Sequence, residues 1–194
     1  MKKTVLYGLL AAATLSMAVA GGVMATQNMH GHYMHGAGDH GGMHEHDEVN
    51  MPGLRGENAT QRESDELALM FRKFDTLSRQ VENLPNGIRT VTRSSDPEVM
   101  DALVSHAVVM IERVAQKDDP KIRIQSPTLD VFFLRGDEIT SQVDVTDEGL
   151  VVVQTSDNPT LVEALHVHAA EVTAMVDRGM AAVHEAMMKQ GRGH

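Results

Sequence analysis

The sequence predicts an α+β fold in which two αββα units, arranged in tandem, join their hairpins into one four-stranded antiparallel sheet packed with helices. The first observation behind this prediction is an internal repeat. Residues 67–114 align without a gap on residues 129–176, and 14 of the 48 aligned pairs are identical. The second is that both copies pass from helical spacing through two β-rich runs and back to helical spacing. A single hairpin is marginally stable in water, so we expect the two hairpins to pair.

The identical pairs lie where the chain turns, begins a helix or fills a core. They stand 62 positions apart and include Phe71/Phe133, Asp75/Asp137, Gln80/Gln142, Val81/Val143, Gly87/Gly149, Pro97/Pro159, Leu103/Leu165, His106/His168 and Ala107/Ala169. We therefore predict a single domain with an approximate internal two-fold axis. Whether the two copies pair within one chain or across a dimer stays open at this point.

The first half of each unit is predicted to be a helix followed by a hairpin. Residues 64–77 carry apolar side chains at helical spacing, at Leu67, Met70, Phe71, Phe74 and Leu77. A strand over 80–84, a turn at 85–87 and a Thr/Val-rich run to residue 93 then predict the hairpin, because proline fixes φ and glycine permits positive φ. In the second copy the corresponding strands are 142–145 and 150–155.

The second helix of each unit begins at a clear signal. Asp96 and Asn158 each stand directly before a proline, which places an N-cap residue ahead of proline at the first helical position. We expect the first of these helices to stop near Pro120. The second has no such stop, so we expect it to run to residue 190, to end at Gly191 and to bend at Gly179.

The N-terminus has the pattern of a secretory signal peptide. Lys2 and Lys3 precede an uncharged apolar run, and Ala18-Val19-Ala20 fits an A-x-A cleavage site, with a second at Ala25. The run is shorter than the about 20 residues of a membrane span, so we expect no stable membrane anchor and a periplasmic protein. Four segments follow: a leader over 1–25, a disordered Met/His-rich tract over 26–62, and repeats over 63–126 and 127–194.

The tract holds the best indication of function. Between Thr26 and Met51 the chain has six histidines and four methionines, while cysteine is absent throughout. Imidazole binds several transition metals and thioether favours Cu(I), so their mixture suits copper that cycles between Cu(I) and Cu(II). The ligands we expect here are Met29, His30, His32, Met34, His35, His40, Met43, His44 and His46. Metal uptake should fall below about pH 6, because imidazole must be neutral to bind.

The predicted domain supplies further candidate ligands. His106 and His168 occupy equivalent positions, so a two-fold axis could bring their imidazoles together on a shared metal or a non-covalent haem b. A structural role at the sheet–helix interface is the alternative. In the last helix His166, Met180 and His184 are candidate metal ligands, and Met187 and Met188 share a side with His184. Such a methionine stripe also suits a core or a dimer interface.

The duplicated segments also carry a resemblance. The motif Ser-Asp-Pro at 95–97, or Ser-Asp-Asn-Pro at 156–159, leading into Leu-x-x-His-Ala at 103–107 and 165–169, resembles exported proteobacterial proteins of unassigned function that hold two such segments. Pieces of the tract such as 39–43 resemble the Met/His-rich segments of periplasmic copper-resistance proteins. The first resemblance implies the fold and no mechanism; the second implies copper.

The composition of the chain limits the kinds of partner and activity that we expect. The formal charge of −10 becomes −12 when the two lysines of the leader are removed, and such an acidic protein is a poor partner for nucleic acid. Motifs for nucleophilic, zinc-dependent or nucleotide-dependent catalysis are absent from the sequence, so we predict no enzyme. The hypothesis is a periplasmic copper buffer or chaperone that meets a metal-accepting protein. The alternatives are a haem-binding or electron-transfer accessory protein and a non-catalytic homodimeric scaffold.

Overall fold

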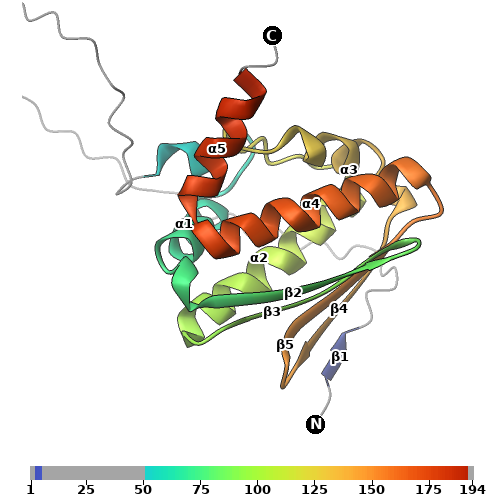
Figure 1. Ribbon diagram of the computed structural model, residues 1–194, viewed down its shortest axis with the longest axis horizontal. Helices are drawn as coiled ribbons and strands as arrows, with labels where there is room; N and C mark the ends of the chain where they lie inside the picture. The colour runs from blue at the N-terminus through green and yellow to red at the C-terminus, as the bar shows by residue number, and fades with distance from the viewer. Residues whose placement is uncertain (1–2, 6–50, 192–194) are drawn as a thin grey trace, which may run out of the picture. The chain divides into compact units, whose positions relative to one another are not determined.

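The computed structural model describes residues 3–5 and 51–191, with side chains over residues 51–189 (Figure 1). Nearly all of the predicted leader and residues 26–50 of the tract lie outside this part of the chain. The predicted α+β fold is confirmed, including its four-stranded antiparallel sheet. The first unit comprises α1 (Gln61–Arg72), β2 (Leu77–Leu84), β3 (Gly87–Ser94) and α2 (Pro97–Gln116). The second comprises α3 (Asp130–Leu134), β4 (Thr140–Thr146), β5 (Gly149–Thr155) and α4 (Pro159–Arg178), and α5 (Met180–Gly191) follows.

The sheet has the order β1-β4-β5-β3-β2, and every neighbouring pair is antiparallel. The four predicted strands are joined by a short fifth strand, β1 (Lys3–Val5), which pairs with β4 at the edge. This strand lies within the segment that the sequence predicts to be a leader. Cleavage at the predicted site would remove β1 and leave β4 as the edge strand of the mature protein.

The two hairpins are related by an approximate two-fold axis within one chain. Ser78 pairs with Arg93 in the first hairpin, and the residues 62 positions later, Thr140 and Thr155, pair in the second. At the junction of β3 and β5, Thr90 pairs with Val152, its own equivalent. The axis therefore passes through that residue pair, and the open question of how the copies combine is answered by one continuous sheet.

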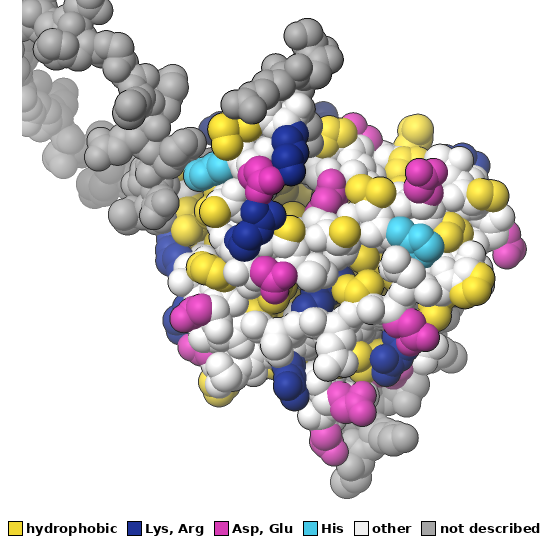
Figure 2. All heavy atoms as spheres, in the orientation of Figure 1, with side chains coloured by type: hydrophobic (Ala, Val, Ile, Leu, Met, Phe, Trp, Pro, Cys, Tyr) yellow, Lys and Arg dark blue, Asp and Glu magenta, His cyan; other side chains and the backbone are white. Residues whose placement is uncertain are grey.

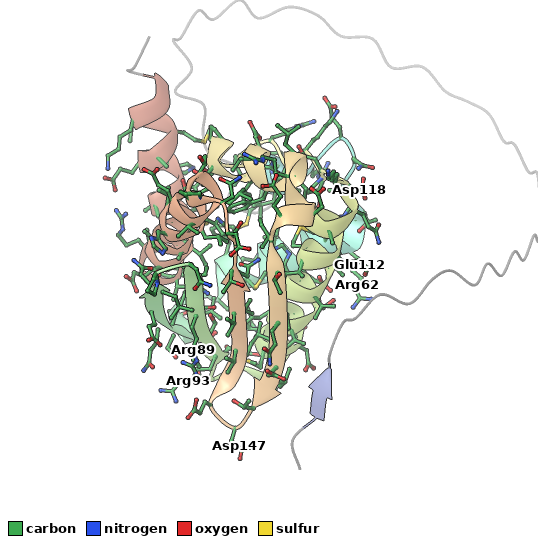
Figure 3. The ribbon with its side chains drawn as sticks, turned by 90° about the vertical axis from the view of Figure 1, so that its right-hand side faces the viewer. Arg62, Arg89, Arg93, Glu112, Asp118 and Asp147 are labelled. Carbon is green, nitrogen blue, oxygen red and sulfur yellow. The ribbon has the colours of Figure 1, made fainter. Side chains whose placement is uncertain are left out.

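The long helices lie on one side of this sheet (Figure 1). Helix α4, from the second unit, contacts β2 and β3 of the first, and α2 contacts β3 and β4. The main core cluster consists of Ile88, Phe132, Leu161, Leu165 and Ala169. On the other face of β3, Arg89 and Arg93 point away from the helices, and Asp147 lies at the tip of the β4–β5 turn (Figure 3). The helices therefore cover each other's hairpins and leave a partly charged sheet face.

The helix starts follow the predicted signals. The Asp96 carboxylate accepts hydrogen bonds from the backbone N–H groups of Glu98 (2.9 Å) and Val99 (3.3 Å), and the Asn158 side chain accepts from that of Thr160 (3.0 Å). Helix α1 starts with a capping box between Thr60 and Glu63. Each of these side chains satisfies N–H groups that the helix itself leaves unpaired.

Two boundaries differ from the prediction. Helix α1 ends at Arg72 and Leu77 already belongs to β2, with a 3₁₀ turn (Phe74–Thr76) between them. In the second copy a 3₁₀ turn (Pro127–Leu129) and the five residues of α3 replace the long first helix. Proline is the physical reason, because at position 127 it aligns with the interior of α1, where it would remove a helical hydrogen bond and clash with the preceding turn.

The second helices of the two units stop at equivalent residues with positive φ. Lys117 ends α2 with φ 56° and ψ 34°, and Gly179, 62 positions later, ends α4 with φ 56° and ψ −139°. The latter conformation is essentially confined to glycine. A Cβ at residue 179 would also lie 2.7 Å from the ring of Phe74. The expected bend at Gly179 is therefore a full interruption, after which α5 starts in a new direction (Figure 1).

The chain enters the domain through a second core cluster. Met51, Leu54 and Ala68 are buried there, and Met180 of α5 packs against them. Met51 is only 8% exposed. The sequence groups this methionine with the tract, but its side chain belongs to the core.

Candidate functional site

The nine tract residues predicted as metal ligands lie outside the described residues. They are Met29, His30, His32, Met34, His35, His40, Met43, His44 and His46. Their role stays a prediction from the sequence. The remaining candidates, His106, His166, His168, Met180 and His184, all lie on the described helices α2, α4 and α5.

His106 is held neutral inside the domain. Its pKa is lowered to about 4, mainly by burial and in part by the nearby charge of His168, while Glu66 and Glu63 of α1 act in the opposite direction. Its Nδ1 is buried and has no hydrogen-bond partner among the described residues. A neutral imidazole with an unused nitrogen keeps the capacity to bind a metal, but it also fits a packed structural residue.

His168, the equivalent residue, has different neighbours. Its ring meets Phe132 edge to face at a centroid distance of 5.6 Å, and its Nδ1 lies 3.8 Å from Oε2 of Glu171. Burial would raise the pKa of Glu171, but the nearby His168 imidazole and the hydrogen bonds from Ser126 and Thr128 lower it overall. The hydroxyls of Ser126 (2.7 Å) and Thr128 (3.1 Å) donate to Oε1 of this glutamate.

The two equivalent histidines thus interact electrostatically but face different side chains. His106 faces glutamates of α1, whereas His168 packs against α3 and the turn before it. Across residues 3–5 and 51–191, three His, Asp or Glu side chains nowhere converge as they would around a metal ion. Ligation of one metal or haem by His106 and His168 therefore remains a prediction from their equivalence in sequence.

His166 is fixed by the hairpin that α4 covers. Its Nε2 lies 2.8 Å from the carbonyl oxygen of Gly87 and 3.2 Å from that of Leu84. A carbonyl oxygen only accepts, so Nε2 carries the proton and, in the neutral ring, Nδ1 keeps its lone pair. The residue lines two surface hollows of about 400 and 360 Å³, one towards Ser156 and the other between Asn83 and Thr173.

Arg79 is largely buried on the same face of β2 as Val81 and Asn83, which line the second hollow. The Nη1 of Arg79 donates to Oγ1 of Thr92 at 2.7 Å, and its buried Nε has no partner in the described part of the chain. Burial lowers the pKa of Arg79 to about 10. In the other half the equivalent side chains are Ser141 and Gln154, which bond to each other at 3.2 Å without a charge.

The second hollow forms a groove between β2 and α4, lined by Val81, Asn83, His166 and Thr173 among others. Sequence reasoning missed this groove. A signal was present in the repeat alignment, because the polar Arg79, Asn83, His166 and Thr173 align with Ser141, Val145, Val104 and Ile111. Acidic, basic and hydrophobic side chains are interspersed over the face of the molecule that carries α4 and β2 (Figure 2). The polar character of the groove is therefore local and does not extend into a single charged patch.

The C-terminal helix places its methionines in two environments. Met180 packs in the cluster around Met51, as a core residue would. Met187 and Met188 are 47% and 56% exposed. Within the described part of the chain, Met180 therefore has a core environment and Met187 and Met188 do not; metal binding or dimer packing by these two stays a prediction. His184 lies between these two environments and is partly exposed.

Comparison of the chain with protein-family models, with curated proteins and with solved structures gives no match. Among the described residues, no helix combines the length and the apolar character needed to cross a membrane.

Proposed function

We propose that this protein is an exported copper-binding protein, a buffer or chaperone, in which residues 26–50 capture the metal. The observation that carries the proposal is the density of imidazole and thioether donors in this segment, six histidines and three methionines without a single cysteine. Soft sulfur together with imidazole favours copper, and Cu(I) in particular, over ions that prefer oxygen ligands. The leader would place this chemistry in the periplasm.

The duplicated domain supports this proposal as a stable carrier for the tract. Its core begins at Met51, directly after the segment that holds the donors. The domain offers Arg79, His106, His166 and His168 as polar groups in or near its interior, but none of them is needed for capture by the tract. Delivery would then require copper to move from the ligands of the tract to those of a metal-accepting protein.

The test is to delete residues 26–50 from the mature protein and to measure bound copper by mass spectrometry after exposure to micromolar Cu(I). Met51 must stay, because its removal would open a cavity in the core. A second variant, in which the nine predicted tract ligands are replaced by serine, controls for the length of the segment. We expect both variants to lose most of the copper. Unchanged copper in both would refute capture by the tract.

The haem hypothesis differs in one measurable respect. It requires His106 and His168 on one iron, so a protein purified from its own host would show a Soret band that the H106A variant lacks. The equivalence of the two residues supports this second candidate, and their different neighbours weaken it. A colourless protein that takes up Cu(I) would favour copper.

A further inference from the structure

The outer face of α5 carries soft metal donors that the domain does not bury. Met187 and Met188 are 47% and 56% exposed, although methionine is a side chain that cores commonly take up. His184 stands three and four residues before them. Residues at i, i+3 and i+4 are neighbours on a helix, with Cβ atoms about 5–6 Å apart. These three side chains therefore share one face and lie within reach of a single ion.

The rest of α5 is fixed, so this face has a defined orientation. Ala182 and Val183 are each 6% exposed and hold the inner side of the helix. Next to this face, one residue after His184, Glu185 pairs with Arg178 and, at 2.6 Å, with Lys189. These two cations lower the pKa of Glu185 to about 2, which keeps its carboxylate charged and engaged with them.

We propose that His184, Met187 and Met188 form a Cu(I) site on α5. Two thioethers and one imidazole are a soft donor set that suits Cu(I) in three-coordinate form, and they give little affinity for zinc. The spacing is that of metal-binding histidines placed at i and i+4 on one helix, with a further donor one turn from the first. The choice of copper as the natural ion rests on the proposed function; the site itself rests on the exposed face of α5.

The base of α5 packs against the residues where the main described segment of the chain begins. Met180, the first residue of the helix, packs in the cluster that buries Met51. The tract is covalently continuous with Met51, and a chain extends at most about 3.6 Å per residue. His46 is five positions before Met51 in the sequence. Covalent linkage of two binding segments in one chain raises the effective concentration of one for the other.

The experiment uses the mature full chain and the variant whose nine tract ligands are serine. Each is combined with M187L/M188L, which keeps the side-chain volume and removes the sulfur. The matched control is M100L/M110L on α2, which makes the same chemical change away from α5. Bound Cu(I) is measured by competition with a chromophoric Cu(I) chelator without oxygen, and the methionine methyl signals are followed by NMR.

We expect the tract-serine protein to bind one equivalent of Cu(I), with an affinity that M187L/M188L lowers at least tenfold and that M100L/M110L leaves unchanged. The methyl signals of Met187 and Met188 should shift on addition of Cu(I). If the tract-serine protein binds no Cu(I), the α5 site is refuted while capture by the tract stands. If it binds Cu(I) with an affinity that M187L/M188L does not lower, the α5 site is refuted whatever the tract binds. If it binds as much as the native chain and M187L/M188L weakens that binding, capture by the tract fails and the α5 site survives. A halved molar mass in M187L/M188L without any change in Cu(I) binding would identify this face as an interface between two copies and refute the metal site.

Discussion

The two αββα units have nearly the same backbone pairing and very different side chains at equivalent positions. Their hairpins share one register, and their second helices stop at equivalent residues, Lys117 and Gly179. Yet the first unit has a buried Arg113–Glu63 ion pair, and the residues 62 positions later are Met175 and Gln125. The comparison teaches that backbone register and helix caps are enough to repeat a fold, while ion pairs, buried charges and exposed donors can differ between the copies.

The largest expected difference between the copies lies in that ion pair. Arg113 donates from Nε to Oε1 of Glu63 at 2.6 Å and from Nη2 to Oε2 at 3.1 Å, and both side chains are nearly buried. Replacing Glu63 with glutamine leaves a buried guanidinium without its main counter-charge and should lower the free energy of unfolding by about 3 kcal/mol. Urea denaturation measures this. The matched change Gln125→Ala should cost less than about 1 kcal/mol.

The pH dependence of this pair has a definite sign. Burial would raise the pKa of Glu63, but Arg113 and the cap at Thr60 lower it overall. A carboxyl whose folded pKa lies below its unfolded value of about 4.3 contributes stability above that pH. The contribution is lost as the pH falls through the folded pKa. An E63Q protein that lost stability as steeply as the native protein over this range would contradict this assignment.

The next largest difference is expected in how the two equivalent histidines make stability depend on pH. The pKa of His106 is about 4 in the folded protein, whereas an unfolded histidine titrates at about 6.5. The unfolded chain therefore binds a proton that the folded protein does not, so stability falls as the pH drops from 6.5 to 4, by up to about 3 kcal/mol. Thermal denaturation over this range should show the slope. H106N should reduce it, and H168N should keep it, because that variant leaves the buried His106 in place.

Replacement of the buried Arg79 should raise the stability of the protein, whereas replacement of Glu63 should lower it. Arg79 has no ion pair within the described residues, and its equivalent is the uncharged Ser141. Replacing Arg79 with methionine removes the desolvation cost of a charge that gains little in return, and we expect a gain of about 1–2 kcal/mol in stability. The control is R89M on β3, whose side chain is 40% exposed and which should change stability by less than about 0.5 kcal/mol. A loss of stability in R79M would show that the guanidinium has a partner in the native protein.

The smallest gain in stability is expected at the helix ends. Lys117 adopts a left-handed conformation that glycine tolerates better, so K117G should stabilise the protein by up to about 1 kcal/mol. At Gly179, the equivalent residue, alanine should destabilise it by about 1–3 kcal/mol, because the conformation there is confined to glycine and a Cβ would meet Phe74. Melting temperatures measure both changes. Effects of the same sign in the two variants would contradict the view that these caps are equivalent.

Much of this fold could be predicted from the repeat itself. The shift of 62 residues, the turn glycines and the Asp-Pro and Asn-Pro caps determine the elements and the pairing of the strands within each hairpin. The short α3 was predictable as well, since Pro127 excludes a helix across that position. Which helix covers which hairpin was not, because helical spacing defines an apolar face without naming the surface it meets.

The candidate sites were less predictable for a related reason. The sequence places His106 and His168 at equivalent positions, but their burial and neighbours depend on residues of other elements, such as Glu66 and Phe132. The exposure of Met187 and Met188 depends on the interruption at Gly179, which turns α5 in a new direction. Met51 counts among the methionines of the tract by composition and is a core residue by contact. The sequence therefore identified the side chains that can bind a metal, but it did not predict which of them the fold buries or what surrounds them.

The pairing of Thr90 with its own equivalent, Val152, has a consequence for the ancestry of the chain. A polypeptide holding a single αββα unit could build the same sheet by self-association, with β3 of one copy against β3 of another and each long helix lying over the hairpin of its companion. Fusion of two such genes would convert a concentration-dependent assembly into a unimolecular fold. Once joined, the halves would no longer have to be identical, and each could acquire features, such as a charged interior or a helical extension, that a symmetric pair would have to carry twice.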